Sequence, residues 1–378
     1  MKVCLFGCYV TNSYEIPSGN SGSLLRKNLE TQNVDVIECH EQLEKISSFF
    51  TTYCKLYSKH RKLNYDVMII PWRGILTLPL AKKIHKKPII YFPAFSIYDT
   101  LVNDRKKIKK DSLRAKFVHF VDKLACKWSD LIVLESSEEI QYFCKEFGLP
   151  KEKFRRCPLA ADESIFYPTK EERKSKNKFL VLFFGSFIPL HGIDTIVKAA
   201  IILQNNNNDI VFKICGDGQT KPEITKMIND HKVKNVELLG IVAKDILIEN
   251  IHLADVCLGI FGNTEKAKKV LTNKVFQILA SKKPLITMES PTTKEYHLED
   301  KKNCILVPPA NTEKLAEAII FLKNEPEKLK EISEEGYKTY CEHLSMRVAG
   351  KKLVSFIDEL IKKRHNIDPH TINYYSNT

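Results

Sequence analysis

The chain lacks an apolar run long enough to cross a membrane as a helix. Its longest strongly apolar stretch, 179–190, is about a dozen residues and contains Gly185 and Pro189, whereas a spanning helix needs roughly 20 residues. The N-terminal segment reaches Gly7 without the long apolar core and cleavage site of a signal peptide. We therefore expect a cytoplasmic protein whose fold starts at its first residues.

Motifs for three kinds of site are also missing. No Asp-x-Asp pair is present to hold a divalent ion on a nucleotide, and no glycine-rich loop ends in Lys-Ser or Lys-Thr as in ATPases. The eleven cysteines include no Cys-x-x-Cys pair, and many lie inside apolar segments. Reduced, buried thiols are therefore expected, rather than a zinc site or a disulfide framework.

What the chain has in excess is positive charge, with a net charge of +13. Segment 101–127 holds nine Lys or Arg residues against three Asp or Glu. Such a segment attracts nucleic acid, an anionic membrane surface or a phosphate-bearing substrate, and a solvated helix face fits equally well. Phe117, Phe120 and Trp128 have helix-core spacing rather than the pattern of a stacking surface, so we expect an anionic membrane and no nucleic acid.

Composition and periodicity predict two α/β domains. A length of 378 residues exceeds what one core usually organises. Short apolar segments alternate with helical periodicity, which is typical of parallel sheets covered on both faces. The expected strands are 3–6, 34–38, 66–70, 88–92 and 131–134, then 179–184, 210–215, 236–239, 256–260, 284–287 and 305–307.

The two series of strands set the expected domain boundaries. The polar, charged segment 168–178 opens with a proline and has no apolar period, which predicts a linker between domains 1–167 and 179–345. The stretch 325–363 is expected to be helical throughout, and its last part, 346–365, to pack back across the first domain. Residues 366–378 are expected to form a frayed tail.

Glycine-containing loops follow several expected strands. Backbone N–H groups of such loops can approach a phosphate, and in open parallel sheets ligands bind beyond the carboxyl ends of the strands. Each of these features also has a plain structural explanation. The loop 18–23 is equally consistent with an ordinary surface loop, and the residues 216–218 suit a tight turn without any ligand. The histidine after strand 179–184 could simply cap the local backbone. The candidate residues are Gly19, Gly22, Gly185, Ser186, His191, Gly216, Asp217 and Gly218.

The most informative segment is 258–287. Thr272 or Asn273 is placed to cap a helix whose first-turn amides, with Lys274 beside them, suit a diphosphate. Gln277 lies one turn further along and can hydrogen-bond ribose hydroxyls. Because the chain lacks an Asp-x-Asp pair, we expect helix dipoles and basic side chains to bind the diphosphate, with no metal and no cofactor.

On these residues the chain resembles the retaining glycosyltransferases of the GT-B fold, in particular the group 1 transferases of family 4. The glycine loop of that family is similar to 185–192 here, and its Gly-x-Gly turn to 216–218. Its base-contacting strand end is similar to 239–242, which includes Ile241, and its ribose and diphosphate helix to 273–287. The resemblance covers nearly the whole chain.

The resemblance implies two Rossmann-like domains facing a cleft. It implies transfer of a hexosyl unit, with retention, from a nucleoside diphosphate sugar to a glycan or lipid-linked acceptor, as in polysaccharide biosynthesis. The second domain would bind this donor, and the first would face the acceptor. Lys266, Lys274 and the amides of Thr272 and Asn273 would stabilise the leaving group, and Asp99 is the candidate catalytic residue of the first domain.

The chain also departs from the family pattern. Phe187 and His191 stand where the glycine loop usually has arginine and lysine, although His191 could still give a phosphate a charge-assisted hydrogen bond. Two glutamates separated by seven residues are replaced by Lys269 and Gln277. These departures keep an alternative open, a GT-B-like protein that binds a nucleotide or glycan without turning it over.

Overall fold

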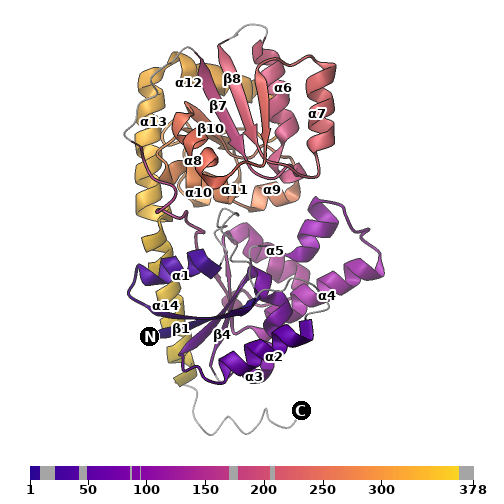
Figure 1. Cartoon of the computed structure of the whole chain (residues 1–378), viewed down its shortest axis with the longest axis vertical. Helices are drawn as coiled ribbons and strands as arrows, with labels where there is room; N and C mark the ends of the chain where they lie inside the picture. Colours follow the sequence, from indigo (N-terminus) through magenta and orange to yellow (C-terminus); the bar gives the residue numbers. More distant parts are fainter. Residues whose placement is uncertain are drawn as a thin grey trace.

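The computed structural model describes residues 1–8, 22–41, 49–85, 87–93, 95–169, 178–204 and 209–365. They form two α/β lobes, one above the other in Figure 1, with two long C-terminal helices along one side. The loop residue Gly19 and most of the expected linker lie outside the described residues.

The first lobe is built on a six-stranded parallel sheet of order β2-β1-β3-β4-β5-β6. Its central strands are buried apolar runs, as expected where helices cover both faces. The strands are β1 (Lys2–Cys8), β2 (Asp35–Glu41), β3 (Val67–Pro71), β4 (Ile89–Phe92), β5 (Leu131–Leu134) and β6 (Phe154–Arg156). The helices are α1 (Gly22–Glu30), α2 (Phe49–His60), α3 (Leu78–Ile84), the π-turn η3 (Asp99–Asp104), α4 (Leu113–Trp128) and α5 (Ser137–Phe147).

The second lobe has a six-stranded parallel sheet of order β12-β11-β10-β7-β8-β9. The strands are β7 (Phe179–Phe184), β8 (Ile210–Cys215), β9 (Val236–Gly240), β10 (Val256–Leu258), β11 (Leu285–Met288) and β12 (Ile305–Val307). The helices are α6 (Ile193–Gln204), α7 (Lys221–Asp230), α8 (Lys244–Leu253), α9 (Glu265–Lys269), α10 (Asn273–Ala280), α11 (Pro291–Glu295) and α12 (Thr312–Asn324). The strand order reverses between β7 and β10, and ligands of doubly wound folds bind at such a switch point.

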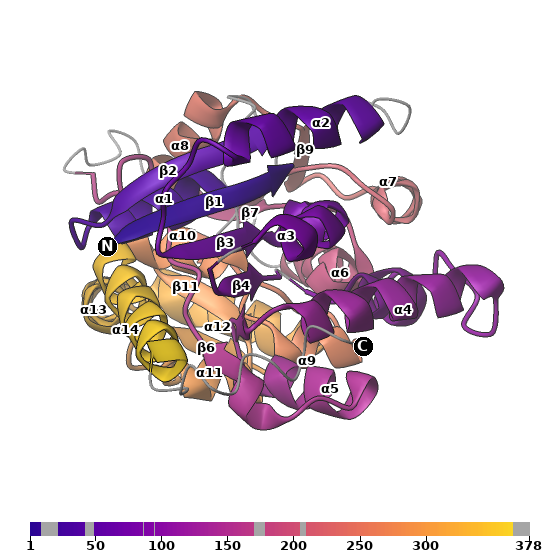
Figure 2. The ribbon, with the colours of Figure 1, turned by 90° about the horizontal axis from the view of Figure 1, so that it is seen from below.

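The C-terminal helices join the lobes. Helix α13 (Pro326–Thr339) lies along the second lobe, and α14 (Met346–His365) packs against α1 of the first (Figure 2). A Cβ atom on Gly350 would lie 2.0 Å from the carbonyl oxygen of Asn28, so only glycine permits this approach. Arg155 on β6 binds Glu359 on α14 with two hydrogen bonds, and this partner lowers the pKa of Glu359 to about 2. The expected return of this helix onto the first domain is confirmed.

Two expectations about these elements need correction. The stretch 325–363 is not helical throughout, because η6 (Tyr340–Leu344) is a π-turn and Ser345 has extended backbone with ψ of 162°. That break turns the chain from the second lobe to the first. Strand β6 was not predicted, because two of its three residues, Arg155 and Arg156, are basic.

Candidate active site

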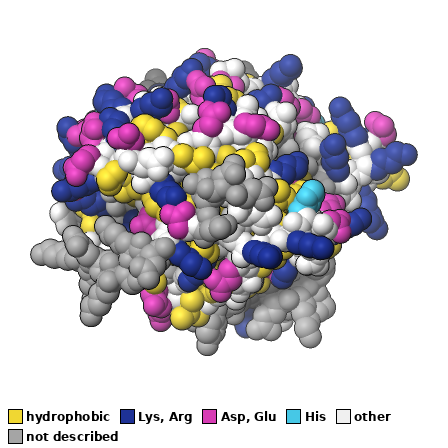
Figure 3. Space-filling model, turned by 90° about the horizontal axis from the view of Figure 1, so that it is seen from above, with side chains coloured by type: hydrophobic (Ala, Val, Ile, Leu, Met, Phe, Trp, Pro, Cys, Tyr) yellow, Lys and Arg dark blue, Asp and Glu magenta, His cyan; other side chains and the backbone are white. Residues whose placement is uncertain are grey.

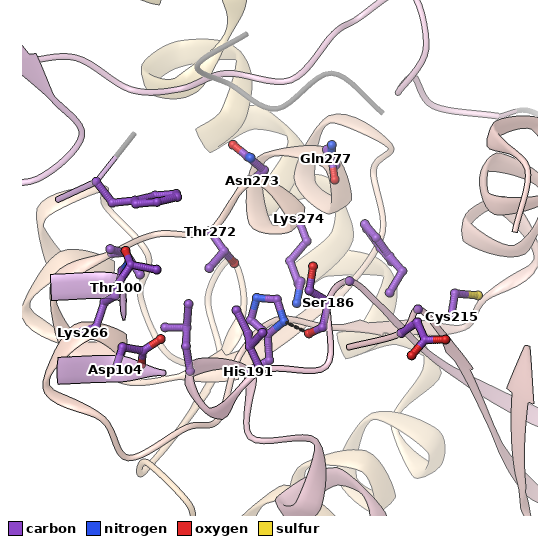
Figure 4. Close-up of a pocket in the computed structure, with 18 of the residues that line it drawn as sticks. Thr100, Asp104, Ser186, His191, Cys215, Lys266, Thr272, Asn273, Lys274 and Gln277 are labelled. Atoms are coloured by element: carbon purple, nitrogen blue, oxygen red, sulfur yellow. Dashed lines mark hydrogen bonds between the residues drawn. The ribbon is translucent and has the colours of Figure 1, made fainter. Parts of the chain in front are cut away.

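A cavity of about 510 Å³ lies between the lobes. Its second-lobe wall comes from the segments that follow β7, β8, β9 and β10, as the strand-end rule predicts. Of the residues that the sequence singled out, those on the cavity wall are Gly185, Ser186, His191, Gly216, Asp217, Ile241, Lys266, Thr272, Asn273, Lys274 and Gln277. Figure 4 shows that the side chains of Lys274 and His191 approach Ser186 in the middle of this cavity.

Lys274 is the most unusual group of the cavity. Its side chain is buried, and its Nζ has no hydrogen-bond partner among the described residues. The nitrogen lies 4.0 Å from the centre of the Phe183 ring, a cation–π contact that offsets little of the lost hydration. Burial lowers the pKa of Lys274 well below its usual range. A buried amine with no counter-charge is well suited to receive an anionic ligand.

His191 lies beside Lys274 but is held in a neutral form. Burial, and then the nearby charge of Lys274, lower the pKa of His191 well below its usual range. Nδ1 of this ring is 2.5 Å from the carbonyl oxygen of Ser186, so Nδ1–H donates there and Nε2 is left as an acceptor. The charge-assisted hydrogen bond to phosphate that we expected from His191 is therefore not available in this state. Lys274 supplies the basic group next to this loop instead.

Helix α10 begins at the same wall. Thr272 occupies its N-cap position, but the hydroxyl makes no capping bond, contrary to expectation, and its buried Oγ1 has no partner in the part of the chain that the structure describes. Gln277 is buried one turn further along. Figure 4 shows Asn273 and Gln277 on the same helix, above Lys274 in this view. The first-turn amides, the Thr272 hydroxyl and the Lys274 amine thus gather at one end of the cavity.

The opposite end of this wall is more apolar. Ile241 follows β9 and is 84% exposed at the rim, with Val242 and Leu247 also on the wall. The carboxylate of Asp217 is already engaged, because it accepts hydrogen bonds from its neighbour Gly218 and from Lys221. These partners lower its pKa. Gly218 does not line the cavity.

Lys266 reaches the cavity by crossing to the first lobe. Its Nζ donates a hydrogen bond to Thr100 Oγ1 and lies 4.1 Å from the centre of the Phe95 ring. Burial lowers the pKa of Lys266, while Glu139 and Asp99 act in the opposite direction. Its charge is thus partly neutralised by the first lobe, unlike that of Lys274. This contact makes Lys266 a link between the lobes as well as a wall residue.

Two buried carboxyl groups lie behind this link. Burial raises the pKa of Glu139 to about 8, against the opposing charges of Lys266 and Lys269. Burial, with the nearby Glu139, also raises the pKa of Glu135 well above its usual range. Glu135 follows β5 and lines the cavity. A raised pKa favours the protonated carboxyl, and in that form Glu135 can donate a hydrogen bond as well as accept one.

Asp99 is not on the cavity wall. Its carboxylate forms an ion pair with Lys269, 2.9 Å away, and also accepts a hydrogen bond from Asn103. The amine of Lys269 lies 3.7 Å from the centre of the Tyr142 ring as well. The lysine that replaces a family glutamate is therefore engaged in joining the lobes. Gly22 starts α1 and likewise does not line the cavity.

The first-lobe wall was largely missed by the sequence analysis. It comprises Trp72, Phe95, Thr100, Asp104, Arg105, Glu135 and Leu159. Trp72 and Glu135 directly follow β3 and β5, and Phe95 lies shortly after β4. The strand-end rule that identified the second-lobe loops also applies to these three residues. None of the first-lobe wall residues belongs to a glycine motif, so no sequence pattern indicated them as candidates. Trp72 and Phe95 pack together with ring centres 4.7 Å apart.

The second lobe matches the model of a known protein family. The family described as glycosyl transferases group 1 matches residues 168–339. The second lobe is thus similar to a group 1 glycosyltransferase domain. The matched residues include every second-lobe residue of the cavity wall.

Individual relatives are distant. The chain is 22% identical over 221 residues to alpha-D-kanosaminyltransferase of Streptomyces kanamyceticus, covering 56% of each chain. It is 24% identical over 147 residues to poly(ribitol-phosphate) alpha-N-acetylglucosaminyltransferase of Staphylococcus aureus (strain COL), covering 38% of this chain and 28% of the relative. The alignments thus span about half, or less, of these two relatives.

Solved structures show that the likeness of fold extends to both lobes. Anabaena HepE, solved in complex with UDP-glucose, superposes with a TM-score of 0.72 at 14% sequence identity. The match covers 95% of this chain and 100% of HepE. The chain therefore has the GT-B fold, and the group 1 family model matches its second lobe.

Proposed function

We propose that this protein is a glycosyltransferase that transfers a hexosyl unit from a nucleoside diphosphate sugar to a glycan or lipid-linked acceptor, with retention of anomeric configuration. The observation that carries the proposal is the unpaired, buried amine of Lys274 at the cavity wall of a group 1 domain. A diphosphate would provide the missing counter-charge. The names of two relatives and the UDP-glucose in HepE support this substrate class.

The leaving diphosphate would lie at the start of α10. There the Lys274 amine, the Thr272 hydroxyl and the first-turn amides can all donate to phosphate oxygens, and such preorganised donors stabilise charge that develops in a transition state. We propose that these groups, rather than a metal ion or other cofactor, hold the diphosphate. The ribose would lie near Gln277, and the base near Ile241.

The acceptor would enter from the first lobe. Trp72 and Phe95 provide aromatic surface there, while Thr100 and Glu135 provide hydrogen-bonding groups. Apolar faces with a few polar groups are typical of small-molecule sites. An acceptor sugar fits this mixture better than the cationic wall opposite.

We further propose that the protein is cytoplasmic and binds an anionic membrane surface. Within the described residues no helix has the length and apolar character to span a bilayer. Lys and Arg side chains gather on the projection at the right of Figure 3, where η3 and α4 extend from the body in Figures 1 and 2. Leu113, Phe117 and Phe120 are 83%, 66% and 57% exposed along one stripe of α4. The expectation that these phenylalanines face a core was wrong.

Apolar side chains flanked by basic ones suit an anionic lipid surface. The stripe has i, i+4, i+7 spacing, and Arg114, Lys116 and the loop 106–110 lie around it. Such a helix inserts its apolar side chains at the headgroup boundary while lysines and arginines contact the lipid charges. This surface would hold the first lobe next to a lipid-linked acceptor.

The test is a donor panel with three readouts. Binding of UDP-, GDP- and ADP-sugars is measured by calorimetry, and release of the nucleoside diphosphate is followed with and without EDTA. We expect binding and turnover for at least one donor, activity that persists in EDTA, and a product whose anomeric configuration by NMR matches the donor. Binding without release would favour the alternative of a non-catalytic nucleotide-binding protein. Absence of binding throughout the panel would contradict the proposal.

A further inference from the structure

The glycine loop of the second-lobe wall lacks the arginine and lysine of the family pattern. Phe187 stands at the arginine position, and its ring is buried in the second-lobe core. His191 stands at the lysine position and is neutral. Lys274 accounts for one missing charge, which leaves the diphosphate short of a second charged partner.

Arg105 of the first lobe lines the same cavity. It directly follows η3, and its side chain is half-buried. Among the described residues, the guanidinium Nε is buried without a hydrogen-bond partner, and no carboxylate forms an ion pair with the side chain. An arginine with a buried, unused donor at a cavity wall has the chemistry to bind an anion.

The position of Arg105 is set from the second lobe. Gln219 Nε2, just after the 216–218 turn, donates a hydrogen bond of 3.1 Å to the Arg105 carbonyl oxygen. The charge of Arg105 contributes to the lowered pKa values of both His191 and Lys266, which places its guanidinium near the two groups. Burial raises the pKa of its neighbour Asp104, while a hydrogen bond to Thr264 and the nearby charges of Lys266 and Arg105 act in the opposite direction.

We propose that Arg105 contacts the diphosphate of the donor from across the cleft and supplies the second positive charge that the glycine loop lacks. This inference rests on the proposed donor, a nucleoside diphosphate sugar. Because Arg105 and Lys274 belong to different lobes, a diphosphate bound by both would also draw the lobes together. Guanidinium groups favour phosphate because two parallel N–H donors can engage two oxygens.

The experiment compares diphosphates with monophosphates. UDP, GDP and ADP, and then the monophosphate of whichever binds best, are titrated into the wild-type protein and the variants Arg105→Ala, Arg105→Gln and Arg105→Lys. We expect about a 10- to 100-fold loss of diphosphate affinity in the first two variants, the size of one charge-assisted contact. Monophosphate affinity should change less than threefold, and Arg105→Lys should recover part of the loss.

Lys107→Ala serves as the matched control, because Lys107 is an exposed cation two residues away that does not line the cavity. It should bind diphosphate like the wild type. Equal diphosphate affinity in the wild type and Arg105→Gln, or an equal loss for mono- and diphosphate, would overturn the role of Arg105 and leave the proposed function standing. A wild-type protein that binds none of the three diphosphates would overturn both.

Discussion

The amine of Lys274 occupies space that any side chain at position 185 would need. A Cβ atom built on Gly185 would lie 2.8 Å from Nζ of Lys274 and 3.2 Å from Cε1 of His191. The glycine at the end of β7 therefore lets a lysine from α10 reach the loop that carries the neutral histidine. Two segments almost ninety residues apart in sequence form one cationic site.

This contact predicts the effect of Gly185→Ala. The methyl group would displace the Lys274 amine and weaken nucleoside diphosphate binding by about tenfold or more, as for the loss of a charge-assisted contact. Gly148→Ala is the control, because Gly148 also has a positive φ but a Cβ atom there meets nothing within 4 Å. Both variants carry backbone strain, so a similar change of affinity in the two would refute the steric explanation. Calorimetric titration of nucleoside diphosphate into each variant measures the affinity.

Lys274 should also reduce the stability of the empty protein. A buried amine without a counter-charge is unfavourable, so Lys274→Met should raise the free energy of unfolding by about 1–3 kcal/mol at pH 7. Urea unfolding measures this change. Lys268→Met is the control, since the Lys268 side chain is 41% exposed and pairs with Glu265, and it should change stability by no more than about 0.5 kcal/mol. Destabilisation by Lys274→Met would show that the amine is compensated in the free protein.

Glu139 predicts a pH dependence of stability. Its pKa is raised from 4.5 to about 8 by burial, so between these values the folded state binds more protons than the unfolded state. Stability from this group is therefore fully present below about pH 4.5 and is lost as pH rises towards 8. Glu139→Gln should reduce the fall in melting temperature between pH 5 and 9, whereas Glu138→Gln, which changes the adjacent glutamate, should not. A Glu139→Gln profile parallel to that of the wild type would disprove this account.

The apolar stripe on α4 predicts membrane binding that depends on two residues. Replacing Phe117 and Phe120 together by Ser should lower co-sedimentation with vesicles containing phosphatidylserine by at least about fivefold, because both side chains lose their contact with the lipid. Wild-type binding should fall as salt rises. Phe50→Ser, at a site 79% exposed on α2, should leave binding unchanged. Equal binding to neutral and anionic vesicles would contradict the proposed surface.

The sequence predicted the strands well because their apolar runs are short and bounded by polar turns. Every expected strand overlaps an observed one, and only β6 was missed. Side-chain environments were harder to predict. The spacing of Phe117 and Phe120 shows that they share a helix face, but whether another element covers that face depends on tertiary packing.

In the candidate site, too, local backbone features were predicted from the sequence, whereas the partners of the side chains were not. Strand ends followed by glycine or a helix start identified the second-lobe wall, because neighbouring residues in the sequence determine the backbone geometry there. The neutral state of His191, the unused hydroxyl of Thr272 and the pairing of Asp99 with Lys269 depend on residues far away in the chain. No local pattern reports such partners. The same holds for Arg105, whose role depends on the opposite lobe.

The most direct test of the account is calorimetric titration of UDP, GDP and ADP into the wild type and Lys274→Ala at pH 8, in two buffers of different ionisation enthalpy. We predict that the variant binds the preferred diphosphate about 10- to 100-fold more weakly. Binding by the wild type should also take up more protons than binding by the variant, because burial lowers the pKa of the Lys274 amine and a bound phosphate would raise it. Unchanged affinity in the variant would contradict the account, since the amine would then not contact the donor.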